Sequence, residues 1–355
     1  MRARDRFFGI GEADTSVPVF DGPLKPDNRL EAADVFLAAE GLDDLCVDSA
    51  GHLFVSAGEV VLAVDASGET KSLVRLPETI QALAAYQDGL VAATRGSLQF
   101  VGGQLDGRVV PLADSAAARC VNALCESPRG TLLISDGSAD VDHAGWSRDL
   151  LNRGRTGRLL EYLPDTGEFR VLSSEMAYCY GVCAHEGGIL ASESWQHRVV
   201  VVRDGKSVAG CGEIPGYPSR IVPAGSGGYW LTVFAPRSQL LEFVLREDGF
   251  RQEMMATVEQ RYWVAPALSS GQDFLEPLQQ GGVRQMGILK PWAPPRSYGL
   301  VIRLDQDLSP RYSVHSRVGG RRHGITAVAE FNGALLALSK GSGSVVRIPL
   351  SDIEK

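Results

Sequence analysis

A glycine followed directly by a short, apolar, β-prone segment recurs six times along this chain of 355 residues. The marker glycines are Gly51, Gly89, Gly130, Gly188, Gly228 and Gly333. Three of the five intervals between them are 38 to 41 residues long, close to the period of about 40 residues for one blade of a β-propeller. An apolar run precedes each marker and a strand-and-turn segment follows it, which gives three clear strands and a weaker fourth per unit. The repeat therefore predicts an all-β fold, a six-bladed β-propeller with short helical and loop insertions.

A TIM barrel also repeats one unit, but it places a helix of about 10 to 15 residues between successive strands. Most connections here are too short for such a helix. Asp-Gly and Asn-Gly pairs indicate tight hairpin turns instead, as at Asp204-Gly205, Asp248-Gly249 and Asn332-Gly333. The segment 240–249 is accordingly expected to be an outer strand of the fifth blade, ending in the second of these turns.

We expect one propeller domain over residues 1–355, with residues 1–34 as an N-terminal extension. Residues 27–40 begin helix-like and end strand-like, and the strand-like end is predicted to pair with the last blade and close the ring. Two long intervals are expected to be lid-like insertions: residues 137–157 interrupt the third blade, and residues 247–297 lie between the fifth and sixth blades. The second contains a segment that favours a short helix, followed by the loop-like stretch 288–297.

The composition of the chain limits the classes of molecule that it is expected to bind. The chain carries 35 Lys and Arg against 43 Asp and Glu, a net charge of −8, and this argues against nucleic acid, which requires a basic surface. No apolar run reaches the length of a membrane span, and no export signal is evident at the N-terminus. We therefore expect a cytoplasmic protein with no membrane partner, whose six cysteines are reduced. The sequence does not predict an oligomeric state.

The repeat also indexes the central channel, where the inner strand of each blade begins. Eight residues before the successive marker glycines lie Asp43, Gln81, Asn122, Tyr180, Arg220 and Ile325. Five of these six are polar at the start of apolar strands, although an unpaired polar group is costly to bury. The pattern favours a ligand-binding funnel; a polar plug whose members satisfy one another is the alternative.

The stretch WSRDLLNRGRTGRLLEYLPDTGEFRVL, residues 146–172, resembles a segment of the strictosidine synthase-like proteins. Residues 40–56 and 216–233 also resemble blade motifs of that group. Over residues 35–350 the chain is similar to the six-bladed superfamily that contains gluconolactonase/regucalcin, paraoxonase and the strictosidine synthase-like proteins. The resemblance implies a propeller enzyme acting in the central funnel, and hydrolysis of a lactone or ester is the class of reaction it favours.

Members of this superfamily that use a metal bind a divalent cation, often Ca²⁺, in the funnel. The resemblance places Asp43, Asp44 and Asn122 at positions of its oxygen ligands, but Tyr180 and the Ser219-Arg220 pair replace the others. Because a guanidinium supplies no oxygen and repels a dication, we expect either no cofactor or one divalent cation, Ca²⁺ if any. Arg220 either pairs with the two aspartates or clamps an anionic group of the substrate.

The expected catalytic residues are Asp43, Asp44, Tyr180, Arg220 and His323. Gln81, Asn122, Ser219 and Trp146 are expected to bind substrate. Tyr180 either donates a hydrogen bond to the substrate or fills space, and His323 is either a general base or a packing residue.

For several other polar residues, a structural or solvent-exposed role is favoured over a catalytic or metal-binding one. Asp136 and Glu193 end strands and are expected to cap turns, and His185 and Glu186 are expected in a solvated turn. Asp140, Asp142 and His143 contain metal-donor side chains, but a flexible polar loop is the favoured interpretation. In strictosidine synthase a glutamate of the last inner strand is the acid/base; the equivalent place is near Thr326, and Glu330 should lie at the far end of that strand. Condensation chemistry of that kind is disfavoured.

The predicted function is the hydrolysis of a lactone or an ester. The predicted substrate is a small polar organic molecule, either neutral or anionic. The alternatives are a non-catalytic small-molecule sensor or carrier, a metal-independent lyase or condensing enzyme related to strictosidine synthase, and an interaction scaffold that uses residues 247–297.

Overall fold

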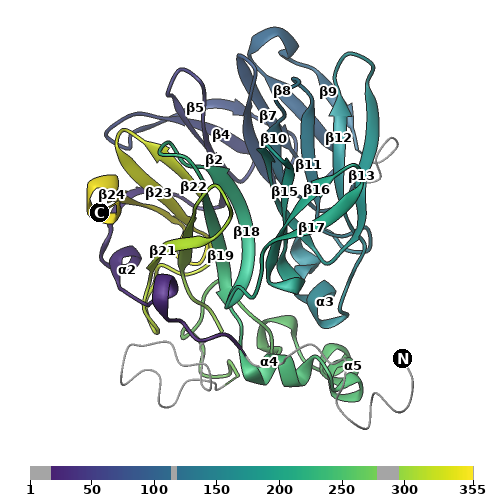
Figure 1. The fold of residues 1–355 in the computed structure, drawn as a ribbon, viewed down its shortest axis with the longest axis vertical. Helices are drawn as coiled ribbons and strands as arrows, with labels where there is room; N and C mark the ends of the chain where they lie inside the picture. The colour runs from purple at the N-terminus through teal and green to yellow at the C-terminus, as the bar shows by residue number, and fades with distance from the viewer. Residues whose placement is uncertain (1–16, 113–117, 278–295, 355) are drawn as a thin grey trace.

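The computed structural model describes residues 17–112, 118–277 and 296–354. Six antiparallel four-stranded sheets stand round a central axis (Figure 1), as the repeat predicted. The strands run, sheet by sheet, as β2–β5 at Leu42–Val47, Leu53–Ala57, Val60–Val64 and Thr70–Arg75; β6–β9 at Ala82–Tyr86, Gly89–Ala93, Ser97–Val101 and Val109–Pro111; β10–β13 at Val121–Glu126, Leu132–Asp136, Gly157–Leu163 and Glu168–Met176; β14–β17 at Cys179–His185, Gly188–Glu193, Arg198–Arg203 and Lys206–Cys211; β18–β21 at Gly216–Pro223, Tyr229–Pro236, Leu300–Leu304 and Pro310–His315; and β22, β23, β24 and β1 at Ile325–Phe331, Ala334–Ser339, Ser344–Pro349 and Asp34–Ala38.

The inner strands β2, β6, β10, β14, β18 and β22 each contact the next, and β22 contacts β2, so the ring is closed. Each blade is covered by a neighbour on both faces. Strands near the axis are therefore mostly buried, and every residue of β11 and of β23 is buried, Ser135 and Asp136 included. The outermost strand β5 is almost entirely exposed. This difference explains why the fourth strand of each repeat gives a weaker signal in the sequence.

The N-terminal strand β1 closes the ring as predicted. It pairs antiparallel with β24, with Val35 opposite Val346 and Leu37 opposite Val345. Leu37 packs into the core between the first and last blades. The short helix α2 (Arg29–Ala32) precedes β1 and buries Leu30 completely.

The prediction of an outer strand at 240–249 was wrong. Residues Gln239–Val244 form helix α4, and Asp248–Thr257 form helix α5, which includes the expected Asp248-Gly249 turn. Ser238 caps α4, because its side chain accepts a hydrogen bond from Leu241 N at 3.1 Å. β19 pairs with β18 on one side, and its partner on the other side is β20, which follows the insertion. The second insertion therefore lies inside the fifth blade, and its predicted place between the fifth and sixth blades was wrong.

The first insertion contributes helix α3 (Trp146–Leu151), and α3, α4 and α5 all lie at the same end of the propeller (Figure 1). The other helical turns of the described residues are η1 (Gly22–Leu24), η2 (Gly103–Leu105), η3 (His143–Gly145), η4 (Ser194–Gln196), η5 (Gln260–Tyr262) and α7 (Leu350–Ile353). Residues 1–16 of the expected N-terminal extension and residues 278–295 of the second insertion lie outside the described residues.

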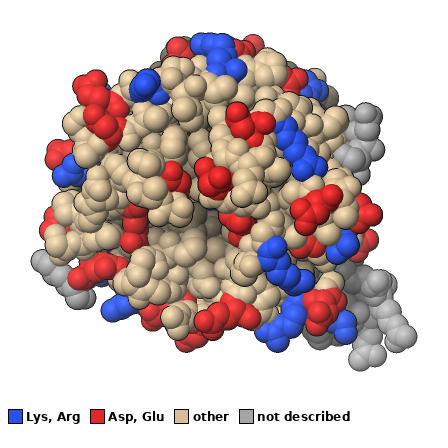
Figure 2. Space-filling view, turned by 90° about the horizontal axis from the view of Figure 1, so that it is seen from above, with Lys and Arg blue, Asp and Glu red and all other residues tan. Residues whose placement is uncertain are grey.

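Figure 2 shows the end of the propeller that faces away from α3, α4 and α5. Its centre is hollowed, and acidic side chains lie round the hollow. None of the helices in the described residues combines the length and the apolar character needed to cross a membrane. All six cysteines are free thiols.

Candidate functional site

Five of the six inner strands have a register irregularity near their first residues. The pairing shifts between Leu42 and Leu45, Val121 and Ala123, Cys179 and Val182, Pro218 and Ile221, and Ile325 and Ala327. A bulge leaves a residue outside the ladder and turns its side chain away from the ordinary alternation. Four of the five polar residues predicted to face the axis lie at these bulges, namely Asp43, Asn122, Tyr180 and Arg220, whereas Gln81 directly precedes β6, which has no bulge. The local backbone therefore explains how polar side chains reach the axis from strands that otherwise pack in the core.

Arg220 is the centre of the polar network on the axis. Its Nη1 donates to Asp43 O at 3.1 Å, and its Nη2 donates to Asp43 Oδ1 at 3.1 Å and to Gln81 O at 2.9 Å. Its Nε lies 3.1 Å from Asp44 Oδ2, an ion-pair distance without hydrogen-bond alignment. The Arg220 side chain is only 5% exposed. Of the two roles open for Arg220, the structure places it in the ion pair with the aspartates.

Asp44 is held by the backbone as well as by Arg220. Its Oδ1 accepts from Leu45 N and its Oδ2 from Leu83 N, both at 2.9 Å. Burial raises the pKa of Asp44 to about 6, and neighbouring Asp43 adds to the rise, although Arg220 and the two amides oppose it. The carboxyl is therefore the group of the network that titrates nearest to neutral pH.

Asp43 has a second cationic partner that sequence analysis missed. The ammonium of Lys340, in the turn after β23, forms a salt bridge with Asp43 Oδ2. Burial alone would raise the pKa of Asp43, but Lys340, His143 and Arg220 together bring it well below its ordinary value. Asp43 is therefore a fixed negative charge between two positive ones.

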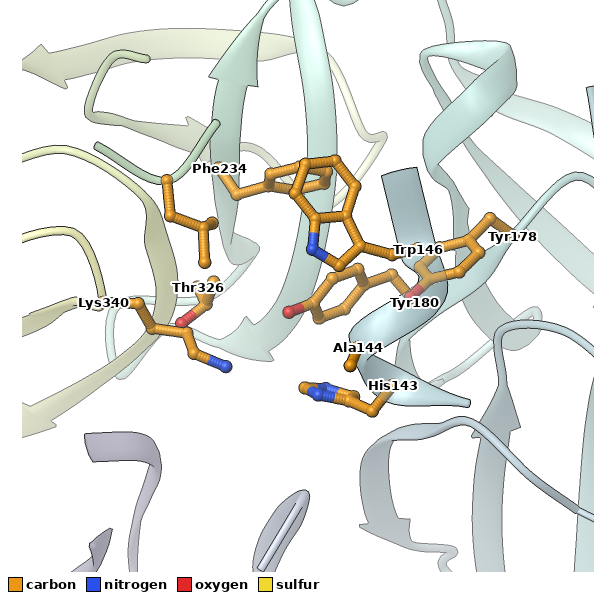
Figure 3. Close-up of a pocket in the computed structure, with 9 residues that line it drawn as sticks. His143, Ala144, Trp146, Tyr178, Tyr180, Phe234, Thr326 and Lys340 are labelled. Atoms are coloured by element: carbon orange, nitrogen blue, oxygen red, sulfur yellow. The ribbon is translucent and has the colours of Figure 1, made fainter. Parts of the chain in front are cut away.

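A cavity of about 180 Å³ lies over this network, at the end of the propeller that carries the insertions. Its lining residues are His143, Ala144, Trp146, Tyr178, Tyr180, Phe234, Leu268, Thr326 and Lys340. Figure 3 shows that the side-chain ends of His143, Tyr180, Thr326 and Lys340 point toward one another, while the rings of Trp146 and Phe234 lie together on another side. The cavity therefore has one polar wall and one aromatic wall.

His143 corrects the interpretation of residues 140–143 as a flexible polar loop. It stands in η3, is half-buried, and lines the cavity. Burial lowers the pKa of His143 to about 4, and the positive charges of Lys340 and Arg220 lower it further, against the opposing effect of Asp43. At neutral pH the imidazole is therefore uncharged. Asp140 and Asp142 do not join it, since they contact Thr156 and Arg95.

Tyr180 and Thr326 supply hydroxyl groups to the polar wall. Tyr180 is 6% exposed, and the Arg220 guanidinium carbon lies 5.7 Å from the centre of its ring. Burial holds the pKa of Tyr180 far above its ordinary value, so the phenol keeps its proton. Thr326 Oγ1 is buried without a hydrogen-bond partner in the described part of the chain. An unpartnered buried hydroxyl that faces a cavity is available to a ligand.

Thr326 is one residue beyond Ile325, the position indexed in the sixth blade. The bulge at the start of β22 gives the axis position to Thr326 and leaves Ile325 in the core. Glu330 lies toward the far end of the strand, as expected, where it accepts hydrogen bonds from Gly225 N and Trp230 Nε1. No carboxylate of β22 therefore reaches the cavity.

The remaining predicted site residues fall into two groups. Trp146 lines the cavity, with its ring centre 5.4 Å from that of Phe234. Asn122 and Ser219 are fully buried and bonded within the protein: Asn122 Nδ2 donates to Cys179 O at 3.1 Å, and Ser219 Oγ lies 2.7 Å from Thr232 Oγ1. Gln81 supplies its backbone oxygen to Arg220, while its Oε1 is buried and unpartnered among the described residues.

His323 does not line the cavity. Its Nδ1 lies 2.7 Å from Ser297 Oγ and its Nε2 lies 3.0 Å from Arg317 O, so both ring nitrogens are occupied. The structure places it as a packing residue. Asp136 and Glu193 have the predicted capping roles: Asp136 accepts from Cys120 N at 3.0 Å, and Glu193 accepts from Ala177 N at 3.0 Å.

The residues on the axis do not fit a Ca²⁺ ion. Ca²⁺ requires about six to eight oxygen ligands, but the four carboxylate oxygens of Asp43 and Asp44 already face a guanidinium, an ammonium or backbone amides. The amide of Asn122 is directed to Cys179 O. In the described ranges no group of three or more His, Cys, Asp or Glu is spaced to hold a metal ion. Arg220 and Lys340 instead place two positive charges beside the carboxylates.

Comparisons with known proteins support the fold. No family model matches the chain. It is 26% identical to the strictosidine synthase-like 2 protein of Arabidopsis thaliana over 152 residues, which are 39% of this chain and 40% of that protein. The chain thus spans well under half the length of that relative.

Solved structures of similar fold include a gluconolactonase from Xanthomonas campestris, with a TM-score of 0.56, 13% identity and coverage of 94% of this chain and 96% of that one. The calcium-binding protein regucalcin of Agrobacterium tumefaciens gives a TM-score of 0.51, 13% identity and coverage of 89% and 95%. A luciferin-regenerating enzyme gives a TM-score of 0.54 and 12% identity, with coverage of 91% of this chain and 94% of that one. The chain therefore has the six-bladed fold of the gluconolactonase and regucalcin structures, together with sequence similarity to a strictosidine synthase-like protein.

Proposed function

We propose that this chain is an enzyme that hydrolyses a small ester or lactone in the cavity over the Arg220 network. The observation that supports the proposal most is the convergence of an ammonium, a phenol, a hydroxyl and an uncharged imidazole on one wall of the cavity (Figure 3). The similarity of the fold to gluconolactonase structures supports the same class of reaction.

Three groups of the polar wall, those of Lys340, Tyr180 and His143, have a role in such a reaction. The carbonyl oxygen of the substrate accepts hydrogen bonds from Lys340 Nζ and the Tyr180 hydroxyl, which stabilise the negative charge that develops there. Uncharged His143 takes a proton from the attacking water as the bond from the water oxygen to the acyl carbon forms. The acyl C–O bond then breaks, and the imidazolium returns the proton to the leaving alkoxide. The products are a carboxylic acid and an alcohol, joined in one molecule when the substrate is a lactone.

Asp43 and Arg220 act as positioning residues in this scheme. Asp43 holds the Lys340 ammonium, and Arg220 holds Asp43 through both its side-chain and main-chain oxygens. Their expected role is therefore to fix the charge and direction of Lys340 rather than to touch the substrate. Asp43→Asn should lower kcat more than it raises KM.

The test is turnover of a panel of small lactones and aryl esters by the wild type and by Lys340→Met and Tyr180→Phe variants. Loss of one oxyanion donor typically lowers the rate about 10²- to 10³-fold, and we expect losses of that order in kcat/KM for Lys340→Met. Exposed Lys71 on β5 is the matched control, and Lys71→Met should leave the rate unchanged. Wild-type rates in both cavity variants would contradict the proposal.

A non-catalytic binding protein is the second candidate. It draws support from the fact that the carboxylates of Asp43 and Asp44 are fully engaged by cations and amides, which leaves no free carboxylate to act as acid or base. The same assay separates the two candidates, because a carrier would bind members of the panel without turning any of them over.

A further inference from the structure

The geometry points to a small organic anion with one apolar ring as the ligand of this cavity, its carboxylate directed at Lys340 and Thr326 and its ring at Trp146 and Phe234. This inference deepens the proposed function, because it names the chemical class that the same cavity accepts. It rests on the donors, the charges and the shape of the cavity, and it does not require that the ligand be hydrolysed.

The polar wall offers hydrogen-bond donors and few acceptors. The Lys340 ammonium has three N–H groups, and its salt bridge to Asp43 is its one side-chain interaction in the described residues. The Thr326 hydroxyl is unpartnered there, and the Tyr180 hydroxyl forms no hydrogen bond with the described residues. The acceptors at or near this wall are one ring nitrogen of uncharged His143 and the Asp43 carboxylate, and that carboxylate is divided between Arg220 and Lys340. A ligand group that only accepts hydrogen bonds, such as a carboxylate, matches this wall.

Charge excludes the ligand class that an aromatic cavity usually suggests. Rings such as Trp146, Tyr178, Tyr180 and Phe234 would suit an organic cation in an otherwise neutral cavity. Here the Lys340 ammonium lines the same space, and the Arg220 guanidinium stands beneath Tyr180. Burial, Lys340 and Arg220 lower the pKa of His143 to about 4, although Asp43 opposes them, so the imidazole adds no positive charge to the wall. An amine would therefore meet repulsion on the polar wall, whereas an anion would meet attraction.

Shape and size select a single ring. The Trp146 and Phe234 rings meet edge to face at 5.4 Å, and Leu268 adds a further apolar side chain to the lining of the cavity. The cavity volume of about 180 Å³ is slightly larger than the roughly 150 Å³ of an engineered apolar cavity that binds benzene. This is enough for one six-membered ring with a carboxylate, and too little for a ligand of drug size.

The test is isothermal titration calorimetry with four probes that differ in one property each. Benzoate carries both ring and charge, benzamide is its neutral analogue, benzylamine carries the opposite charge, and acetate lacks the ring. We expect benzoate to bind at least 10-fold more tightly than benzamide and acetate, and benzylamine to show no heat of binding. Binding of benzylamine equal to or tighter than that of benzoate would overturn the inference, as would the absence of benzoate binding to folded wild-type protein.

Variants assign the binding to the cavity. Lys340→Met should weaken benzoate binding at least 10-fold, Thr326→Val should weaken it several-fold with almost no change in shape, and Lys71→Met should have no effect. Circular dichroism verifies folding, and Thr326→Val keeps the test decisive if Lys340→Met does not fold. Unchanged affinity in a folded Lys340→Met or Thr326→Val variant would move the site elsewhere and overturn the inference.

The outcome is separable from that of the proposed function. Benzoate binding without turnover of any ester or lactone would leave this inference standing and contradict hydrolysis. Turnover of lactones without carboxylate binding would do the reverse.

Discussion

Among single residues, Arg220 is the buried cation around which the polar network on the axis is arranged. It is the buried partner of two carboxylates and also satisfies two backbone oxygens from other blades. A buried ion pair contributes less to stability than its Coulomb energy suggests, because both partners lose their hydration. Removing one partner is different, since it leaves the other charges buried and uncompensated.

Arg220→Met should therefore lower the free energy of unfolding by about 3–5 kcal/mol, measured by urea denaturation at neutral pH. Arg75→Met is the matched control, because Arg75 pairs with Glu59 on the exposed surface, where an ion pair contributes at most about 1 kcal/mol. Adding Asp43→Asn and Asp44→Asn to the Arg220 variant should recover part of the loss. A loss as small as that of the control would show that the network is solvated.

Asp44 should give the protein a distinct dependence of stability on pH. Its pKa is raised to about 6 from an ordinary value of 3.8, so the folded chain holds a proton between pH 4 and 6 that the unfolded chain has released. The contribution of Asp44 to stability is therefore largest below about pH 4 and decreases as the pH rises to 6.

The free energy of unfolding of the wild type minus that of Asp44→Asn should accordingly fall between pH 4 and 6 and be level above pH 7. Urea titrations at several pH values measure this difference. The buried histidines contribute equally to both proteins, so their opposite dependence on pH cancels in the difference. The control is Asp65→Asn, whose exposed carboxylate has a pKa lowered by its hydrogen bond to Ser67. Its difference should be level over the same window. A rising difference for Asp44→Asn would contradict the assignment.

Among the elements of the fold, the bulged beginnings of the inner strands position the site, and they require close approach of neighbouring backbones. Gly181 on β14 shows this clearly, because a Cβ at this position would lie 2.4 Å from Ser219 O and 3.0 Å from Arg220 Cα on β18. The two strands can lie this close only if residue 181 has no side chain.

Gly181→Ala should therefore force β14 and β18 apart, lower the free energy of unfolding by about 1–3 kcal/mol, and weaken benzoate binding through displacement of Arg220. The matched control is Gly249→Ala in helix α5, where a Cβ meets nothing within 4 Å. That change should be neutral or stabilising by up to about 1 kcal/mol. Urea denaturation and calorimetry measure both variants, and equal effects would remove Gly181 from the packing of the site.

The sequence predicted the elements best where burial and periodicity agree. The apolar inner strands and their marker glycines were placed correctly, and Asp204-Gly205 and Asn332-Gly333 adopt the positive φ angles of tight turns. Segment 240–249 was misassigned, because Leu240, Leu241, Phe243 and Val244 fit a short strand as well as a helix face. The N-cap at Ser238, a local signal, was the feature that distinguishes the two.

The candidate site was predicted in part, for a related reason. The repeat predicted that Asp43, Asp44 and Arg220 lie close together, because they lie in the part of each inner strand that is nearest to the axis. Lys340 directly follows β23, and the antiparallel pairing of β23 with the inner strand β22 brings this end of β23 beside the start of β22, near the axis. In register, Ser339 is the residue of the sixth blade that is equivalent to Asp136 and Glu193, so Lys340 lies one residue beyond the strand end that the repeat indexes. His143 lies in an insertion, and no periodic pattern predicts where an insertion folds.

For the whole molecule, ring closure depends on a strand that comes from the opposite end of the chain. β1 pairs with β24 with Asp34 opposite Arg347, so the two strands form an antiparallel pair that a direct connection could also produce. If spatial adjacency alone matters, the order of the strands in the chain is exchangeable. A circular permutant that begins at Glu40, with a flexible linker joining residue 355 to residue 17, should then fold into the same ring, because the chain is opened between half-buried Ala39 and exposed Glu40, where the turn before β2 begins.

We expect this permutant to retain most of the wild-type free energy of unfolding and to bind benzoate with unchanged affinity. The matched control is the same chain without residues 1–39. It loses the burial of Leu30 and Leu37, at about 1.5–3 kcal/mol each, and exposes the edge of β24. Urea denaturation should place the truncated chain well below the permutant. Equal stability of the two would mean that β1 does not close the ring, whereas failure of both would mean that the connection before β2 contributes to folding in its own right. The expected separation follows from closure itself, since a ring of packed blades gains its last inter-blade contacts only when the sixth sheet is complete.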